Sequence, residues 1–199
     1  TANELGPFFY KSNQQSVLFF TREINGNLDI CSYDIIRNVL SAYPQINTTA
    51  NEAYITYHNA TKTFLYCSDE GGDFDICKIS ESDLESDAAL PIEYETALNS
   101  PKDDKCPYIR DNLMVFTSKR DGGFGVFDLW YSVFDEENGW SEPENFGEHI
   151  NTEHDEYRPI IAPTNEDTYL NDFMLFSSNR PGGLGGFDLY YVGIPKNLK

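Results

Sequence analysis

The chain has 199 residues, enough to bury a hydrophobic core, and 15% of them are aromatic. Its formal net charge is −19, from 33 acidic residues against 14 basic ones. A surface this acidic repels nucleic-acid phosphates and anionic lipid headgroups, so neither is expected as a partner. No apolar run approaches the roughly 18 residues that span a bilayer, so direct membrane insertion is not expected either.

Four copies of one pattern fill the chain, and repeats of roughly 20–50 residues are typical of solenoids and propellers. Each copy has an acidic residue near its start and, further on, an aspartate between apolar neighbours (Glu4 and Asp29, Glu52 and Asp75, Asp104 and Asp128, Glu156 and Asp188). In the last three copies an asparagine lies five residues before the acidic one (Asn47, Asn99 and Asn151). We expect a single domain over 1–199, with repeats at approximately 1–46, 47–98, 99–149 and 150–199.

Short apolar and aromatic runs predict three strands in each copy. In chain order they cover 7–11, 17–21 and 28–33, then 53–57, 63–67 and 74–79, then 107–110, 114–118 and 127–133, and finally 159–162, 173–177 and 187–192. A fourth strand is expected over 91–97 and over 140–146, and an extended loop over 163–172.

A glycine-bearing turn separates the second and third strands of every copy, at Gly26, Gly71-Gly72, Gly122-Gly123 and Gly182-Gly183. Glycine supplies the positive φ that a tight hairpin requires, so the strands are expected to be antiparallel. Three to four antiparallel strands per repeat predict an all-β fold, a β-propeller with four visible blades.

The third and fourth copies carry the longest motif. It begins Ile150-Asn151-Thr152, continues through Asp155-Glu156 and Pro159, and ends Phe176-Ser177-Ser178-Asn179-Arg180-Pro181-Gly182-Gly183-Leu184-Gly185-Gly186-Phe187-Asp188-Leu189-Tyr190. This pattern resembles the TolB-type WD40-like β-propeller repeat, and the resemblance covers nearly the whole chain. It implies a propeller of the bacterial cell envelope, exported to the periplasm, often linked to OmpA-like domains and acting as a protein-interaction platform.

The two ends of the chain lead to one expectation. Thr1 opens directly onto strand-like sequence without a signal peptide, and the last copy stops before any fourth strand. We expect an excised domain or a processed product of an exported protein.

The four cysteines (Cys31, Cys67, Cys77 and Cys106) lack the paired spacing of a zinc site. Cys67 and Cys77 flank a predicted hairpin, so a disulfide between them is one alternative. Cys31 and Cys77 occupy the same place in two copies, which favours the other alternative, small apolar residues packed within strands.

The repeated aspartates, Asp29, Asp75, Asp128 and Asp188, are candidate structural carboxylates that accept backbone N–H groups of the glycine turn. Catalysis needs a few groups converging on one point, whereas these recur identically in each copy. Four residues near the later turns are candidates for binding an anionic group (Ser118, Arg120, Ser178 and Arg180). The alternative for these arginines is an exposed ion pair of little energetic consequence.

Metal and cofactor signals are absent from the sequence. The acidic run 69–75 offers oxygen ligands to calcium, but it lacks the spacing of a calcium loop, so a solvated hairpin is the favoured interpretation. The three histidines have no metal-ligand spacing, and no nucleophile elbow, P-loop or dinucleotide motif occurs. We expect no cofactor, no metal and no enzymatic activity.

These observations lead to two functional hypotheses. The first is a non-catalytic envelope propeller whose blade-connecting loops bind a protein partner, with a small-molecule ligand not expected. The alternative is a carbohydrate-binding or glycan-processing propeller, because aromatic rings stack on sugars and carboxylates can perform acid–base chemistry.

Overall fold

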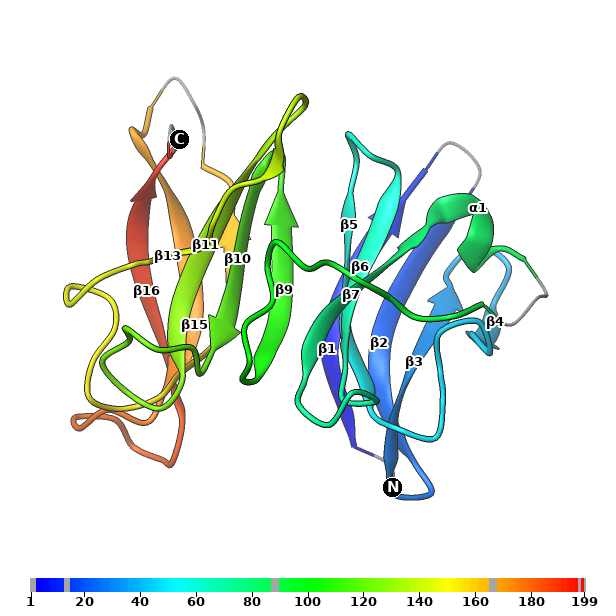
Figure 1. Ribbon diagram of the computed structural model, residues 1–199, viewed down its shortest axis with the longest axis horizontal. Coiled ribbons are helices and arrows are strands. Elements are labelled where there is room, and N and C mark those ends of the chain that lie inside the picture. Colours follow the sequence, from blue (N-terminus) through cyan, green and yellow to red (C-terminus); the bar gives the residue numbers. More distant parts are fainter. Residues whose placement is uncertain (1–2, 13–14, 87–89, 165–167, 197, 199) are drawn as a thin grey trace.

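The computed structural model describes residues 3–12, 15–86, 90–164, 168–196 and 198. Its strands form four antiparallel sheets, and one short helix, α1 (Glu81–Leu84), follows the third strand of the second sheet. The four sheets are arranged as the blades of a β-propeller, numbered 1 to 4 along the chain (Figure 1). The predicted all-β propeller fold is therefore confirmed.

Within each blade the strands follow one another from the inner strand outward. Blade 1 contains β1 (Glu4–Lys11), β2 (Ser16–Ile24), β3 (Asn27–Asp34) and β4 (Val39–Ala42). Blade 2 contains β5 (Glu52–His58), β6 (Thr63–Ser68), β7 (Asp75–Ser80) and β8 (Glu93–Tyr94). Blade 3 contains β9 (Asp104–Arg110), β10 (Leu113–Ser118) and β11 (Asp128–Asp135), whose outer edge pairs with both β12 (Gly139–Trp140) and β13 (Glu144–Asn145). Blade 4 contains β14 (Glu156–Ala162), β15 (Asn171–Ser178) and β16 (Asp188–Pro195).

The outer strands differ most from the prediction. The segment 140–146 is divided into β12 and β13, because Pro143 between them has no N–H to donate to a ladder. Strand β4 was not predicted, and all four of its side chains are exposed, so it lacks the alternating burial that marks a strand in sequence. Helix α1 was also not predicted, although the Ser80 hydroxyl caps it by accepting the N–H of Asp83.

Each inner strand contains a β-bulge that the sequence did not reveal. The register with the middle strand shifts in every blade, and one residue there has left-handed backbone geometry. These residues are Gly6, Tyr54, Cys106 and Arg158, with φ of 54°, 58°, 53° and 54°. Strand pairing continues through the bulge to the acidic residue two positions earlier. Each inner strand therefore begins earlier than predicted.

The core consists of three apolar clusters, each between two successive blades. The middle strands show how neighbouring side chains divide between them. Tyr66 belongs to the cluster between blades 1 and 2, and Leu65 to the cluster between blades 2 and 3. Likewise Phe116 contributes to the second cluster and Val115 to the third. Since successive strand residues point to opposite faces, the middle strands of blades 2 and 3 each join their blade to both neighbours.

All four cysteine thiols are free and buried, which confirms the packing interpretation. In the β6–β7 ladder Cys77 lies opposite Tyr66, and Cys67 lies opposite Ile76, so the two thiols are not cross-strand partners. Burial raises the pKa of Cys77 to about 12, which keeps its thiol protonated at neutral pH.

Among the described residues, no helix is both long enough and apolar enough to cross a membrane.

Candidate functional site

The acidic residues that open blades 2, 3 and 4 are completely buried: Glu52, Asp104 and Glu156. Each carboxylate accepts the backbone N–H of the residue four positions earlier, at 2.8 Å from Thr48, 2.6 Å from Ser100 and 2.8 Å from Thr152. These bonds tie the connection that enters a blade to its inner strand. A buried carboxylate still costs free energy unless a counter-charge is close.

In blades 3 and 4 the counter-charge is one of the predicted binding arginines. Arg120 donates to Asp104 at 2.6 Å and to the carbonyl of Leu98. Arg180 donates to Glu156 at 2.9 Å and to the carbonyl of Ile150 at 2.7 Å. The two arginine side chains are only 12% and 20% exposed. They are thus partly buried ion pairs and not the exposed pairs of the alternative interpretation.

The predicted serines belong to the same clusters. Ser118 and Ser178 accept hydrogen bonds from the arginine Nε atoms at 2.9 and 3.0 Å, and both serines are buried. The four candidate residues therefore meet in pairs, each pair around one buried carboxylate. Their hydrogen bonds run to the chain itself, and a role in binding an external ligand stays a prediction.

Blade 2 lacks this arginine. Glu70 occupies the equivalent position, since its N–H donates to the Ser68 hydroxyl at 3.2 Å just as that of Arg120 donates to Ser118 at 3.0 Å. In the described part of the chain no basic side chain pairs with Glu52. Burial raises the pKa of Glu52, and the hydrogen bonds from Thr48 only partly oppose this.

The repeated aspartates differ between blades. The Asp128 carboxylate accepts the N–H groups of Phe124 at 2.5 Å and of Gly125 at 3.0 Å, and Asp188 accepts that of Gly185 at 3.1 Å. All three bonds close the hairpin after the middle strand, as the predicted structural role of these two aspartates requires. Asp29 and Asp75 make no such bond within the described residues, and burial raises the pKa of both.

The four left-handed residues of the inner strands meet in one small cavity of about 60 Å³. Arg158 is exposed, and its guanidinium lies over the Tyr54 ring, 5.0 Å from the centroid. A Cβ on Gly6 would come within 2.6 Å of the same ring, so glycine there lets β1 approach Tyr54 closely. We call this arrangement the axial site, because all four inner strands contribute to it.

The electrostatics of the axial site are dominated by Arg158. No described carboxylate lies within ion-pair distance of its guanidinium. Burial raises the pKa of Tyr54 well above its ordinary value and that of Cys106 to about 12, while Arg158 opposes both shifts. At neutral pH the neighbouring Tyr54 and Cys106 are uncharged, so the site presents one positive charge beside an aromatic ring. Such a site can bind a carboxylate or another anionic group.

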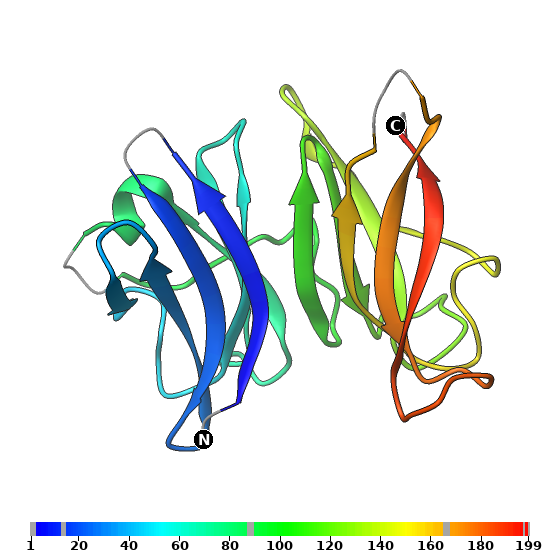
Figure 2. The same ribbon diagram turned by 180° about the vertical axis from the view of Figure 1, so that it is seen from behind.

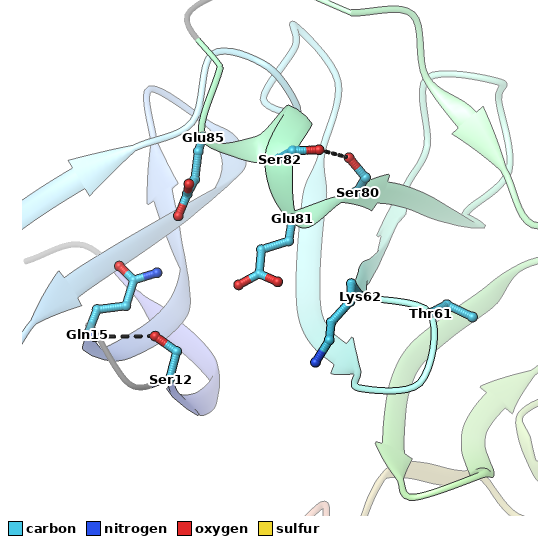
Figure 3. Close-up of a pocket in the computed structure, with 8 residues that line it drawn as sticks. All are labelled: Ser12, Gln15, Thr61, Lys62, Ser80, Glu81, Ser82 and Glu85. Atoms are coloured by element: carbon cyan, nitrogen blue, oxygen red, sulfur yellow. Dashed lines mark hydrogen bonds between the residues drawn. The ribbon is translucent and has the colours of Figure 1, made fainter.

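A larger groove of about 530 Å³ lies between the loops of blades 1 and 2. It is lined by Ser12 and Gln15 after β1, Thr61 and Lys62 before β6, and Ser80, Glu81, Ser82 and Glu85 around α1. Figure 3 shows the side chains of Glu81, Glu85, Gln15 and Lys62 directed toward a shared space. The groove is polar and includes both hydrogen-bond donors and acceptors.

Two tyrosines fix the Glu81 carboxylate at the floor of this groove. The hydroxyls of Tyr10 and Tyr57 donate to it at 2.5 and 2.9 Å. The bond from Tyr10 is the main cause that lowers the pKa of Glu81, with further contributions from Tyr57 and Lys62. At neutral pH Glu81 is therefore an ionised, oriented hydrogen-bond acceptor.

No group of three or more His, Cys, Asp or Glu side chains is placed to hold a metal ion within the described ranges. In the acidic run 69–75, the Asp69 carboxylate accepts the N–H and the side-chain amide of Asn51 at 2.8 and 2.7 Å. This carboxylate is therefore engaged in joining the start of β5 to the end of β6.

Comparisons with known proteins identify the fold. No protein-family model matches the chain, and no curated protein matches it. Among solved structures, TolB from Acinetobacter baumannii superposes with a TM-score of 0.56 at 16% identity, over 95% of this chain and 43% of that one. An α-L-arabinofuranosidase from Podospora anserina, in complex with cellotriose, gives 0.56 at 11% identity, over 95% and 64%. An endo-arabinase from Bacteroides thetaiotaomicron gives 0.56 at 15%, over 97% and 75%.

These likenesses show the fold alone, and the chain spans less than half of the TolB chain. They nevertheless correct one expectation. The prediction of no enzymatic activity is wrong, because propellers of this architecture include glycoside hydrolases. The prediction relied on the identity of the four repeats, but catalytic groups occupy individual positions on a propeller and need not recur in each blade.

Sequence reasoning missed both the axial site and the groove. The axial residues share a backbone conformation but no residue type, so they form no motif. The groove collects side chains from three segments that are distant in sequence. The related signal in the sequence was the asparagine five residues before the acidic residue in the last three copies, since it marks the connection that leads into each inner strand.

Proposed function

We propose that this chain is a ligand-binding propeller domain of an exported envelope protein, and that its axial site binds a protein partner through a carboxylate group. The observation that carries this proposal is Arg158. It is an exposed guanidinium stacked on Tyr54, without a described carboxylate partner, in a chain of net charge −19. A cation in such surroundings is neutralised at close range only by an incoming anion.

Two further observations support the proposal. The axial site is preorganised, since Tyr54 and Arg158 both lie at bulges fixed by their strands. The likeness to TolB and the resemblance of the repeat favour an envelope protein with a protein partner.

The test uses fluorescent peptides with aspartate and glutamate side chains, beside matched peptides with asparagine and glutamine. The chain is expected to bind the acidic peptides, and Arg158→Ala to weaken binding about tenfold or more. Arg37→Ala is the charge-matched control, because Arg37 lies in blade 1 after β3 and pairs with Asp34. Equal binding of both peptide sets, or equal losses in both variants, would contradict the axial assignment.

A second candidate function is glycan binding or processing in the groove between blades 1 and 2. The oriented Glu81 carboxylate favours it, because an ionised acceptor beside Lys62 and Gln15 suits a ligand with many hydroxyl groups. The arabinan-degrading enzymes among the similar folds give the ligands to test first.

Calorimetry with arabinan, arabinoxylan and cello-oligosaccharides, together with assays for released sugars, tests this candidate. Glu81→Gln is expected to abolish binding, whereas Glu136→Gln, in the exposed turn after β11, should have no effect. Glycan binding that survives Glu81→Gln would exclude the groove.

A further inference from the structure

In the part of the chain that the structure describes, blades 1 and 4 each have a sheet face that no other blade covers. Four blades make only three apolar clusters, and none of these clusters joins blade 4 to blade 1. Figure 2 shows blade 1, in blue, and blade 4, in orange to red, at the two ends of the array. Among the described residues, the ring of blades is therefore open.

Equivalent residues show what is missing at blade 4. The residue after the repeated aspartate is Ile30, Ile76 and Leu129 in blades 1 to 3, and each is 0% exposed against the next blade. In blade 4 the same position is Leu189, which is 76% exposed. An exposed leucine alone means little, but here three structural equivalents of this residue are buried.

The exposure extends over a whole face. In blade 3 the residues of the middle and third strands that pack against blade 4 are Leu113, Val115, Leu129 and Tyr131. By the strand registers, their equivalents in blade 4 are Phe173, Leu175, Leu189 and Tyr191. We call these four residues the open face. Tyr191 is 74% exposed, and its ring contacts Phe173 edge-on, with centroids 5.9 Å apart.

Blade 1 is open on its opposite side. Phe9 of β1 occupies the position of Ile109 in β9 and Ile161 in β14 by strand register. Those isoleucines are 7% and 2% exposed against the preceding blade, whereas Phe9 is 52% exposed. The two ends of the array thus carry the two complementary halves of a blade-to-blade interface.

A backbone clamp accompanies every existing interface. Asn47, Asn99 and Asn151, each preceding a new blade, accept the N–H of Ile30, Ile76 and Leu129 at 2.8, 2.7 and 2.8 Å. Each asparagine also donates its amide to the carbonyl of the same residue at 2.8, 2.9 and 2.9 Å. Within the described ranges no asparagine clamps Leu189, and no strand pairs with the outer edge of β16.

We propose that the open face of blade 4 is the docking surface for a further blade of the same repeat, which clamps Leu189 with its own asparagine. This occupant fits because the face matches, position by position, the surface of blade 3 that binds blade 4, and because the equivalents of Leu189 in blades 1 to 3 are each buried by the next blade. The solved propellers of similar fold also extend beyond the matched blades, since this chain covers 43% to 75% of them. The proposal is independent of the axial and groove functions.

The test extends the chain by one blade in register. Residues 1–195 are followed by a second copy of 136–199, because Pro195 and Asp135 lie equally far after their repeated aspartates. We expect hydrogen exchange of the Leu189 amide to slow by at least roughly 100-fold and the melting temperature to rise. The control carries Phe176→Asp and Asn151→Ala in the added copy only, and its Leu189 should exchange as in the parent chain.

Other results of these measurements would contradict the proposal. If the added blade forms strands but Leu189 exchanges as fast as before, the proposal is wrong. If the 199-residue chain is a dimer by light scattering and Leu189→Asp makes it monomeric, the occupant is a second copy. Should the extension fail to fold, exchange is measured on the protein isolated from its source cells. There Leu189 should be as protected as Leu129, and an unprotected Leu189 would overturn the proposal.

Discussion

Glu70→Arg should stabilise the protein by giving blade 2 the guanidinium that blades 3 and 4 already have. The new side chain would start from the same backbone position as Arg120, beside Ser68. From there the guanidinium can reach the Glu52 carboxylate and the carbonyl of Ile46, which correspond to Asp104 and Leu98. Glu70 itself is exposed, so little is lost when it is removed.

The expected gain in stability depends on which interactions of the Glu52 carboxylate are missing. Its carboxylate already accepts three hydrogen bonds, two from Thr48 and one from Ser68, so the missing contribution is that of a counter-charge. A hydrogen bond to a charged group contributes about 1.5–3 kcal/mol, and ordering an arginine side chain costs up to about 2 kcal/mol. We expect a net gain of about 1–2 kcal/mol, or about 2–8 °C in melting temperature for a chain of this size.

The pH dependence distinguishes this mechanism from a general charge effect. Burial raises the folded-state pKa of Glu52, so its contribution to stability is lost as pH rises from about 4.5 through that raised pKa. An adjacent guanidinium lowers this pKa, so the advantage of Glu70→Arg should be largest at neutral pH and disappear in acid. Urea unfolding of the parent, Glu70→Arg and Glu70→Gln across this range is the assay. A Glu70→Arg variant no more stable than Glu70→Gln at pH 7 would refute the reasoning.

Three further predictions concern groups inside the blades. Arg120→Ala leaves the buried Asp104 without its counter-charge, so the free energy of unfolding should fall by about 3–5 kcal/mol. Urea titrations measure this loss, and a loss below about 1 kcal/mol would be inconsistent with the ion pair. Asp128→Ala should cost about 1–3 kcal/mol, because the N–H groups of Phe124 and Gly125 lose their acceptor, while peptide binding by the folded fraction stays unchanged. All four thiols should resist a thiol-specific reagent in the native protein and react after denaturation, and rapid labelling of any one of them would contradict its burial.

The repeat made the blades predictable. Asp29, Asp75, Asp128 and Asp188 all come after a glycine turn, and in the structure all four begin or lie near the start of the third strand of a blade. Their spacing therefore fixed the number of blades and the order of strands. Local chemistry alone was sufficient here, because a hairpin is formed by residues close together in sequence.

The site residues were less accessible, for physical reasons. Arg120 was expected at the surface, but packing of successive blades buries Asp104, and the arginine follows its counter-charge inward. Gly6 and Arg158 are chemically unrelated, and only the shared left-handed bulge brings them to one place. The burial of Arg120 and the meeting of Gly6 with Arg158 both depend on how the blades pack against one another. The type of a single residue does not predict that packing.

The central claim is that the four repeats are structurally equivalent and that their packing leaves the open face of blade 4 uncovered. Hydrogen exchange of four amides in the 199-residue chain measures this in one experiment. We expect strong protection at Ile30, Ile76 and Leu129, whose N–H groups are held by asparagines, and fast exchange at Leu189. Equal protection at all four amides in a monomer would show that the ring closes on itself, and equally fast exchange would show that the blades do not pack as described.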